Sequence, residues 1–338
     1  EYEIAYHRLR GGDGMFGICA ASIRVGTIKR ALAAAAAVLL FTASSAVADT
    51  DKISFDFPLP TSLLGEGSSL INKHLRDFQS ALKSEAEMEI KFVTDADSWD
   101  KVIARLETEH TDMAWMPPYY YARARYFNPK SSIRPLAIYK TGSSIRSPSC
   151  IYVRKDAGHK NMQDIMAGRV HLPDESAWAV LNSIFANDPE LSKYKIDPTV
   201  FFSSFKVLNR ESSARALMFK TTDAIVLEPE YLKHIVSGHK PLADGIVPLA
   251  CSKPLPNVII VYRKDMDERL VESLRLVLAN MHNYDSFKSL RHYFKISKGM
   301  WTNVSHDDLK PWIDLHREAV AGGWENTYKK YVLEDRKS

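Results

Sequence analysis

The sequence predicts an α/β protein of two lobes with mostly parallel sheets, and three observations point to this fold. Short alternating apolar runs are repeatedly followed by stretches with helical spacing, which is the order of elements in α/β layers. Two linker-like segments, 141–148 and 252–257, divide the chain between two sets of strands. Of the 338 residues, 45% are hydrophobic and 25% are charged, which is an ordinary globular balance. We therefore expect two lobes joined by a two-crossing hinge, with a cleft between them.

The first set of elements begins with a strand and an amphipathic helix. The helix has apolar residues at i, i+4, i+7 and i+11, which share one face: Ile71, Leu75, Phe78 and Leu82. A second helix is opened by Asp97 or Ser98, and a third begins at Pro117–Pro118, because polar caps and proline suit a first turn. The strands are expected at 53–57, 88–93, 112–116 and 134–139.

The second set follows the linker at 141–148, and the chain then returns to the first lobe through a strand at 258–262. The tail is helical, with a pattern resembling a capping box at Ser305 and Asp308 and a stop at Gly322–Gly323. Strands of the second set are expected near 150–154, 169–172, 199–205, 223–227 and 246–250, and helices near 161–166, 175–187, 209–219 and 228–237.

Residues 24–48 have the layout of a secretory signal peptide. A basic stretch ending at Lys29–Arg30 precedes an apolar run from Ala31 to Phe41, which is too short to span a bilayer, and small residues end at Ala48. We expect cleavage after Ala48 and export of the remainder. The predicted domains are a presequence at 1–48, a first lobe at 49–146 with 258–338, and a second lobe at 147–257.

The composition excludes several classes of protein. Lys and Arg number 45 against 41 Asp and Glu, and this net charge of +4 is too small to indicate a nucleic-acid partner. Three cysteines are too few for a disulfide scaffold, and no Cys/His spacing of the zinc-finger kind occurs. Neither a nucleophile elbow nor a zinc-protease, Walker or Rossmann glycine pattern is found. We therefore expect no enzyme, no cofactor and no metal ion.

Five short sequence motifs between residues 50 and 290, taken in order, carry a resemblance to a known family. They are Asp112–Tyr121 (DMAWMPPYYY), Ser149–Asp156 (SCIYVRKD), Met162–Val170 (MQDIMAGRV), Thr222–Glu228 (TDAIVLE) and Ser252–Asn257 (SKPLPN). The ordered set resembles the phosphate/phosphite/phosphonate-binding branch of the periplasmic solute-binding proteins that serve ABC transporters. In that branch the first and last strings read D-x-A-W-x-G-P-x-x-Y and S-P-P-I-P-N.

This resemblance implies a periplasmic binding protein type II-like fold that captures one small oxyanion-like solute between its lobes. It also implies a monomer in the periplasm that delivers a phosphonate-, phosphite- or phosphate-type solute to an ABC permease at the inner membrane. In open α/β sheets, ligands bind beyond the carboxyl ends of strands, where helix N-termini direct N–H groups inward. The loops expected there are 58–62, which contains Thr61, then 117–121, 174–178 and the start of a helix at Arg210.

Several expected ligand-binding positions differ from the family pattern. The family has a Ser-Thr-Ser-like triplet that hydrogen-bonds a tetrahedral anion, but here only Ser176 remains, beside Trp178 between two alanines. The family's histidine falls at Arg210 and its aspartate at Glu228, whereas Tyr121 matches the family's tyrosine. The resemblance therefore implies that these five residues bind the ligand, with contacts that differ from those of the family.

These replacements suggest specific chemistry. Arg210 could bind an oxyanion bidentately, and Trp178 could stack on or wall off an apolar or cationic group. Glu175 and Glu228 argue against a site built only for a multiply charged anion, because nearby carboxylates would repel it unless they were protonated. By contrast, Arg123 and Arg125 stand two apart on a helix, and we expect them to point to different faces and to be solvated.

Cys150 allows three interpretations. It can be a small buried hydrophobe, half of a disulfide with Cys251, or a thiolate ligand in the site. Some relatives in this branch sense arsenite for two-component systems, and a thiolate would bind trivalent arsenic. The alternative function is therefore a periplasmic sensing subunit, for arsenite or another oxyanion, that acts on a sensor histidine kinase.

Overall fold

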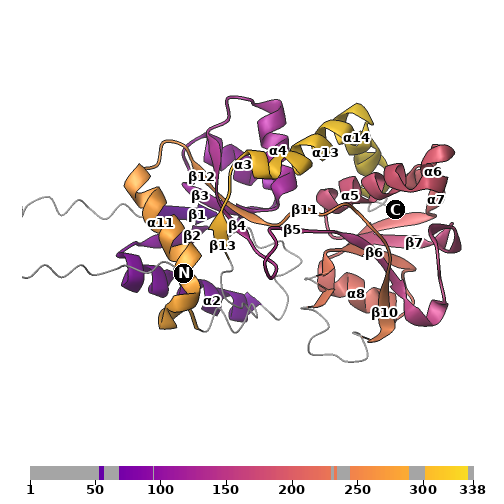
Figure 1. Ribbon diagram of the computed structural model, residues 1–338, viewed down its shortest axis with the longest axis horizontal. Coiled ribbons are helices and arrows are strands. Elements are labelled where there is room, and N and C mark those ends of the chain that lie inside the picture. The colour runs from indigo at the N-terminus through magenta and orange to yellow at the C-terminus, as the bar shows by residue number, and fades with distance from the viewer. Residues whose placement is uncertain are drawn as a thin grey trace, which may run out of the picture. The chain divides into compact units, whose positions relative to one another are not determined.

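The chain folds around two α/β sheets, one of six strands and one of five (Figure 1). The computed structural model describes residues 53–56, 68–93, 95–229, 232–233, 244–288 and 301–333. All of them belong to the unit Asp51–Ser338. Among these described residues, no helix has both the length and the apolar character needed to cross a bilayer.

The six-stranded sheet forms the first lobe, and its strand order is β13-β4-β12-β3-β1-β2. β1 is central to the parallel part, because it pairs in parallel with both β2 and β3. Its alternating apolar residues are buried, with Ile53 and Phe55 at 2% and 3% exposure. The strands are β1 (Ile53–Asp56), β2 (Ile90–Val93), β3 (Met113–Met116), β4 (Ile133–Tyr139), β12 (Ile259–Arg263) and β13 (Trp301–Asn303).

The five-stranded sheet forms the second lobe, with the order β10-β6-β9-β7-β8. β7 pairs in parallel with β8 and β9, whereas β6 pairs antiparallel with β9 and β10. β9 is buried along its whole length, as expected of an inner strand covered on both faces. The strands are β6 (Cys150–Arg154), β7 (Arg169–Leu172), β8 (Ser204–Val207), β9 (Ala224–Leu227) and β10 (Ile246–Cys251).

Both sheets are mixed, so the expectation of mostly parallel sheets is wrong. Among the described strands, parallel pairing is confined to β1–β2, β1–β3, β7–β8 and β7–β9, and the other strand pairs of the two sheets are antiparallel. Parallel neighbours need a crossover connection, usually a helix. β6 and β12 directly follow the crossing segments, and each runs antiparallel to both of its neighbours.

Two crossing segments pair with each other between the lobes, as the predicted hinge requires. β5 (Arg146–Ser147) and β11 (Leu255–Pro256) form a two-stranded antiparallel sheet. Asn257 directly follows β11, and its side-chain amide donates to Tyr139 O at the end of β4 at 3.1 Å. The two-lobe α/β architecture is confirmed, while the domain boundaries given above remain a prediction.

The helices of the first lobe begin where the caps and prolines predict. Ser98 caps α3 by accepting from Lys101 N at 3.4 Å, and Pro118 opens α4 after Pro117. All three tyrosines of the 119–121 run are buried. The helices are α2 (Ser68–Ala86), α3 (Trp99–Glu107), α4 (Pro118–Phe127) and α11 (Glu268–Asn280), with 3-10 turns η4 (Met281–Asn283) and η5 (Asp285–Phe287).

The second lobe differs from the sequence prediction at 199–205. The first part of this run is a helical turn, α7, because Asp197 accepts from Thr199 N at 2.7 Å and Pro198 fixes the first position. The strand β8 starts only at Ser204. The helices are α5 (Glu175–Asn187), α6 (Pro189–Lys193), α7 (Pro198–Phe201) and α8 (Arg210–Met218), with 3-10 turns η2 (Lys155–Ala157) and η3 (Met162–Ile165).

The C-terminal helices contact elements of both lobes. α13 packs on α4 of the first lobe, whereas α14 packs on α5 and the π-helical turn η7 packs on β8 (Figure 1). The capping box at Ser305 and Asp308 is present, with the Asp308 carboxylate accepting from Ser305 N at 2.8 Å. The elements are η6 (Asp307–Leu309), α13 (Lys310–Ala321), α14 (Trp324–Tyr328) and η7 (Lys329–Leu333).

Candidate functional site

Three polar residues meet at the carboxyl edge of the five-stranded sheet. Asp174 stands between β7 and α5, Arg210 opens α8 after β8, and Glu228 follows β9. Arg210 Nε and Nη2 each lie 3.3 Å from an oxygen of Glu228. Arg210 Nη2 also lies 3.8 Å from Asp174 Oδ2. The structure thus brings the predicted residues Arg210 and Glu228 together as an ion pair where the strands end.

The start of α5 is already capped by the chain itself. Asp174 accepts from Ala177 N at 3.2 Å, and the Ser176 hydroxyl donates to the same carboxylate. A carboxylate at this position satisfies backbone N–H groups and suits the positive end of the helix dipole. Ser176, predicted to hold the ligand, is therefore engaged with Asp174 at the helix start.

Trp178 is buried in the second lobe, and its described contacts are with protein groups. Its side chain is 1% exposed and packs edge-on against Phe205, with ring centroids 5.1 Å apart. Its indole N–H donates to Trp324 O in α14 at 2.8 Å. Trp178 lies on the face of α5 that the C-terminal segment covers, so the indole anchors that segment to the second lobe.

Tyr121 is buried within the first lobe. Its hydroxyl lies 3.0 Å from His306 Nδ1, and its side chain is 1% exposed. Burial raises the pKa of Tyr121 to about 12, so the phenol keeps its proton at neutral pH. The described contact of its hydroxyl is thus with His306 and not with the Arg210 pair.

Cys150 forms a disulfide with Cys251, which is one of its three interpretations. The two residues face each other on β6 and β10, with Cα atoms 4.0 Å apart. Because both sulfurs are in the bond, Cys150 provides no thiolate for trivalent arsenic in this structure, and the ligand interpretation is corrected. Thr61, the remaining predicted residue, lies outside the described residues.

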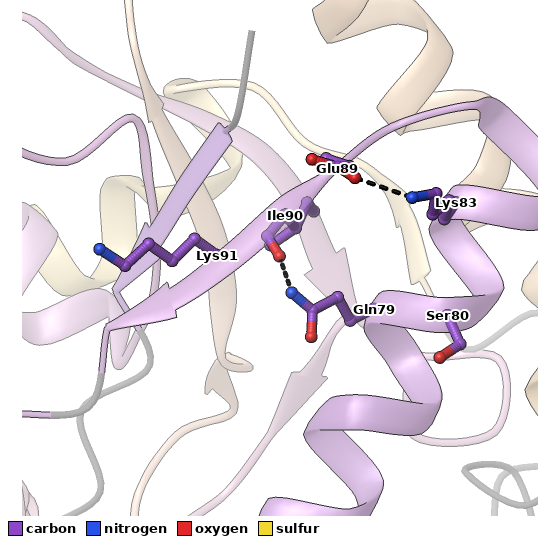
Figure 2. A pocket seen from close by; sticks show the side chains of 6 residues that line it. All are labelled: Gln79, Ser80, Lys83, Glu89, Ile90 and Lys91. Atoms are coloured by element: carbon purple, nitrogen blue, oxygen red, sulfur yellow. Dashed lines mark hydrogen bonds and ion pairs between the residues drawn. The ribbon is translucent and has the colours of Figure 1, made fainter. Parts of the chain in front are cut away.

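A surface pocket of about 380 Å³ lies away from all these residues, between α2 and β2 (Figure 2). Two of its charged groups form an ion pair, with Lys83 Nζ 2.7 Å from Glu89 Oε1. The Gln79 amide donates to Ile90 O on the strand. Figure 2 shows Lys83 turned toward Glu89 and Gln79 turned toward Ile90, whereas Lys91 extends away from both pairs.

A second arginine cluster, which the sequence did not predict, lies at the contact between the lobes. Arg123 of α4, expected to be solvated, is 17% exposed and binds Glu175 of α5 at 3.0 Å. It also lies 3.1 Å from Asp100 of α3 and 3.8 Å from Glu325 of α14. The Tyr119 hydroxyl donates to Glu175 Oε1 at 3.3 Å. The sequence contained one indication of this cluster. Arg123 stands four positions after Tyr119 on the same helix, and residues at i and i+4 share a face.

The electrostatics of this cluster follow from burial. Burial raises the pKa of Glu175, and the nearby Arg123 offsets this only in part. Burial also opposes the charge on Arg123, but the surrounding carboxylates, Glu175 first, outweigh it and raise the pKa of Arg123. Among the described residues, no cluster of three or more His, Cys, Asp or Glu side chains could hold a metal ion.

A two-lobe α/β fold with paired crossing strands and polar side chains at a sheet's carboxyl edge is that of a solute-binding protein of ABC import systems. Residues 64–308, well over half of the chain, match the family described as ABC transporter, phosphonate, periplasmic substrate-binding protein. The chain belongs to this family, which confirms the resemblance seen in the sequence. A comparison with curated protein sequences gives no significant match.

Solved structures show the same fold. A binding protein component of an ABC phosphonate transporter from Pseudomonas aeruginosa is 15% identical, with a TM-score of 0.63 over 79% of this chain and 86% of that one. PhnD1 from Prochlorococcus marinus, in complex with methylphosphonate, is 12% identical, with a TM-score of 0.63 over 80% and 98%. The periplasmic aliphatic sulphonate binding protein from Escherichia coli is 12% identical, with a TM-score of 0.52 over 80% and 88%.

Proposed function

We propose that this protein captures a small oxyanion-bearing solute, of phosphonate, phosphite or phosphate type or a related kind, and delivers it to an ABC permease. Family membership supports the delivery role. The observation that carries the choice of site is the meeting of Arg210, Glu228 and Asp174 at the carboxyl edge of the five-stranded sheet. At this edge the strands end and the helices α5 and α8 begin, as in other α/β ligand sites.

We also propose that the protein is exported to the periplasm. The signal-peptide layout of residues 24–48 supports export to the periplasm, with cleavage after Ala48. We propose that the mature protein acts as a monomer and without covalent chemistry. No contact among the described residues favours a sensor kinase over a permease as its partner, so sensing is not carried forward.

A ligand screen on the full chain tests this function. Titration calorimetry and thermal shifts with methylphosphonate, phosphite, phosphate and methanesulfonate should show saturable binding of at least one of them. Arg210→Gln should weaken that binding by at least about tenfold, because a guanidinium-to-oxyanion contact is charge-assisted. The matched control is Arg215→Gln on the same helix, whose exposed side chain binds Glu211 at 2.6 Å.

The possible outcomes test the role of Arg210 and the solute class separately. Unchanged affinity in Arg215→Gln with weakened affinity in Arg210→Gln supports the site. Equal affinity in both variants contradicts the role of Arg210. If none of the four oxyanions binds, the proposed solute class is wrong.

A further inference from the structure

The carboxylate of Glu175 accepts hydrogen bonds from two side chains of α4, at the place where α4 and α5 meet. Arg123 Nη1 donates to Glu175 Oε2 at 3.0 Å, and the Tyr119 hydroxyl donates to Glu175 Oε1 at 3.3 Å. Two donors on separate side chains therefore bind the two oxygens of one anion. Proteins bind the edge of a carboxylate, sulfonate or phosphonate group in the same way.

Both donors are fixed by contacts that do not involve Glu175. Tyr119 is 2% exposed, and its ring lies edge-on to Trp312 and His316. Burial raises the pKa of Tyr119, so its hydroxyl keeps the proton that it donates. Arg123 also lies 3.1 Å from Asp100. Both donors therefore retain other partners if Glu175 moves away.

Glu175 can be replaced without loss of the helix start. It is the first residue of α5, but the cap is supplied by the preceding Asp174. Burial of its carboxylate raises the pKa of Glu175, which means that the charged form loses hydration at this place. Rotation of the side chain into water would restore that hydration.

The charge balance selects the kind of anion. Glu325 is paired with Lys329 at 2.9 Å, and the Asp100 side chain is 67% exposed and screened by water. Replacement of Glu175 by a singly charged group keeps the charge around Arg123 unchanged. A doubly charged group would add a negative charge close to Asp100 and Glu325 and would be repelled.

We propose that Arg123 and Tyr119 form an oxyanion subsite, occupied in this structure by Glu175, and that a singly charged oxyanion of the solute displaces Glu175. The proposal rests on the proposed function and names the charge state of the solute group. The partners of the two arginines are adjacent in the chain, because Glu175 binds Arg123 and Asp174 lies near Arg210. Both therefore flank the start of α5.

Titration calorimetry with methanesulfonate and methylphosphonate on the full chain tests the subsite. Glu175→Ala removes the internal competitor and should raise affinity by at least about tenfold. Arg123→Gln should lower affinity by at least about tenfold, and Tyr119→Phe should lower it by a smaller factor because only one neutral donor is lost. The controls are Arg125→Gln and Tyr126→Phe on the same helix, which should leave affinity unchanged.

A comparison of the two ligands at different pH values tests the preference for a singly charged group. Methanesulfonate stays singly charged across the titration, whereas methylphosphonate becomes doubly charged as the pH rises. The ratio of the two affinities cancels titration of protein groups that affect both ligands equally, and it should shift toward methanesulfonate between about pH 5.5 and pH 8. An unchanged ratio would overturn the preference for a single charge.

Failure of the subsite differs from failure of the function. If the wild type binds an oxyanion and Arg123→Gln and Tyr119→Phe bind it equally well, the subsite is wrong and the function stands. If neither the wild type nor Glu175→Ala binds any of the oxyanions, both are wrong. Circular dichroism checks that each variant folds, and Tyr119→Phe, which removes a single hydroxyl, keeps the test decisive should Arg123→Gln fail to fold.

Discussion

The two lobes are stabilised in different ways. The second lobe is built from one continuous segment, β6 to β10, and a disulfide joins its first and last strands where the chain enters and leaves. The first lobe is assembled from distant segments, because β12 inserts between β3 and β4 and β13 pairs with β4. Covalent closure limits the unfolded states of one lobe, whereas the other depends on packing between chain segments that folding must bring together.

The largest expected effect concerns the disulfide. Cys150→Ala with Cys251→Ala should destabilise the second lobe by about 4 to 5 kcal/mol, because the bond closes a loop with a sequence separation of 101. Urea unfolding followed by hydrogen exchange of the two sheets measures this difference. The first sheet should keep its protection under mild conditions. Reductant should change the wild type in the same direction and leave the variant unaffected. Equal loss in both sheets would remove the distinction between the lobes.

An intermediate effect concerns one buried histidine in each lobe. The imidazoles of His316 on α13 and His171 on β7 are 1% and 6% exposed, and burial lowers the pKa of each to about 4. Among the described residues, the charged groups that shift the pKa of His316 are Arg123, which lowers it, and Glu325, which raises it. Next to His171 they are Lys206 and Arg169, which lower it, and Asp223.

The sign follows from the unfolded pKa of about 6.5. Above that pH both histidines are neutral in both states, and their stability contribution is fully present. As the pH falls from about 6.5 to 4, the unfolded chain binds protons that the folded protein does not, so each site loses up to about 3 kcal/mol. His316→Phe and His171→Phe should each flatten the stability curve between pH 7 and 4.5. A slope unchanged by His316→Phe would show that this histidine does not cause the acid sensitivity.

The smallest effect concerns the Arg210–Glu228 pair. Its side chains are 25% and 33% exposed, and partly exposed ion pairs contribute little to stability. A double-mutant cycle with Arg210→Gln and Glu228→Gln should give a coupling free energy below about 1 kcal/mol in chemical unfolding. A coupling above about 2 kcal/mol would mean that the pair stabilises the second lobe, and that its place at the strand ends reflects structure more than ligand binding.

The predicted fold and the predicted site fared differently. Alternation and helical spacing located β1, α5 and β9 well, because burial imposes these patterns directly on neighbouring residues. The pairing sense of the strands was missed, since the direction in which a crossing segment enters a sheet leaves no mark on its composition. The run at 199–205 failed because Asp197 and Pro198 begin a helical turn before the strand.

The strand ends indicated which polar residues lie together, but the sequence did not indicate the partners of the other side chains. Arg210 and Glu228 lie together because both follow neighbouring strands. Trp178 occupies the expected helix but points to the face that α14 covers, and Arg123 is bound by carboxylates from three other elements. These outcomes depend on elements far apart in the sequence.

The sequence by itself determined the alternation of strands and helices, the two linkers and the family, because these are recorded in local order and spacing. Only the tertiary structure decided that Cys150 and Cys251 are bonded and that Glu175 occupies Arg123 and Tyr119. Each of these contacts joins residues more than 50 positions apart. Their partners are fixed by packing and by the cost of burying unpaired charge, which local sequence does not record.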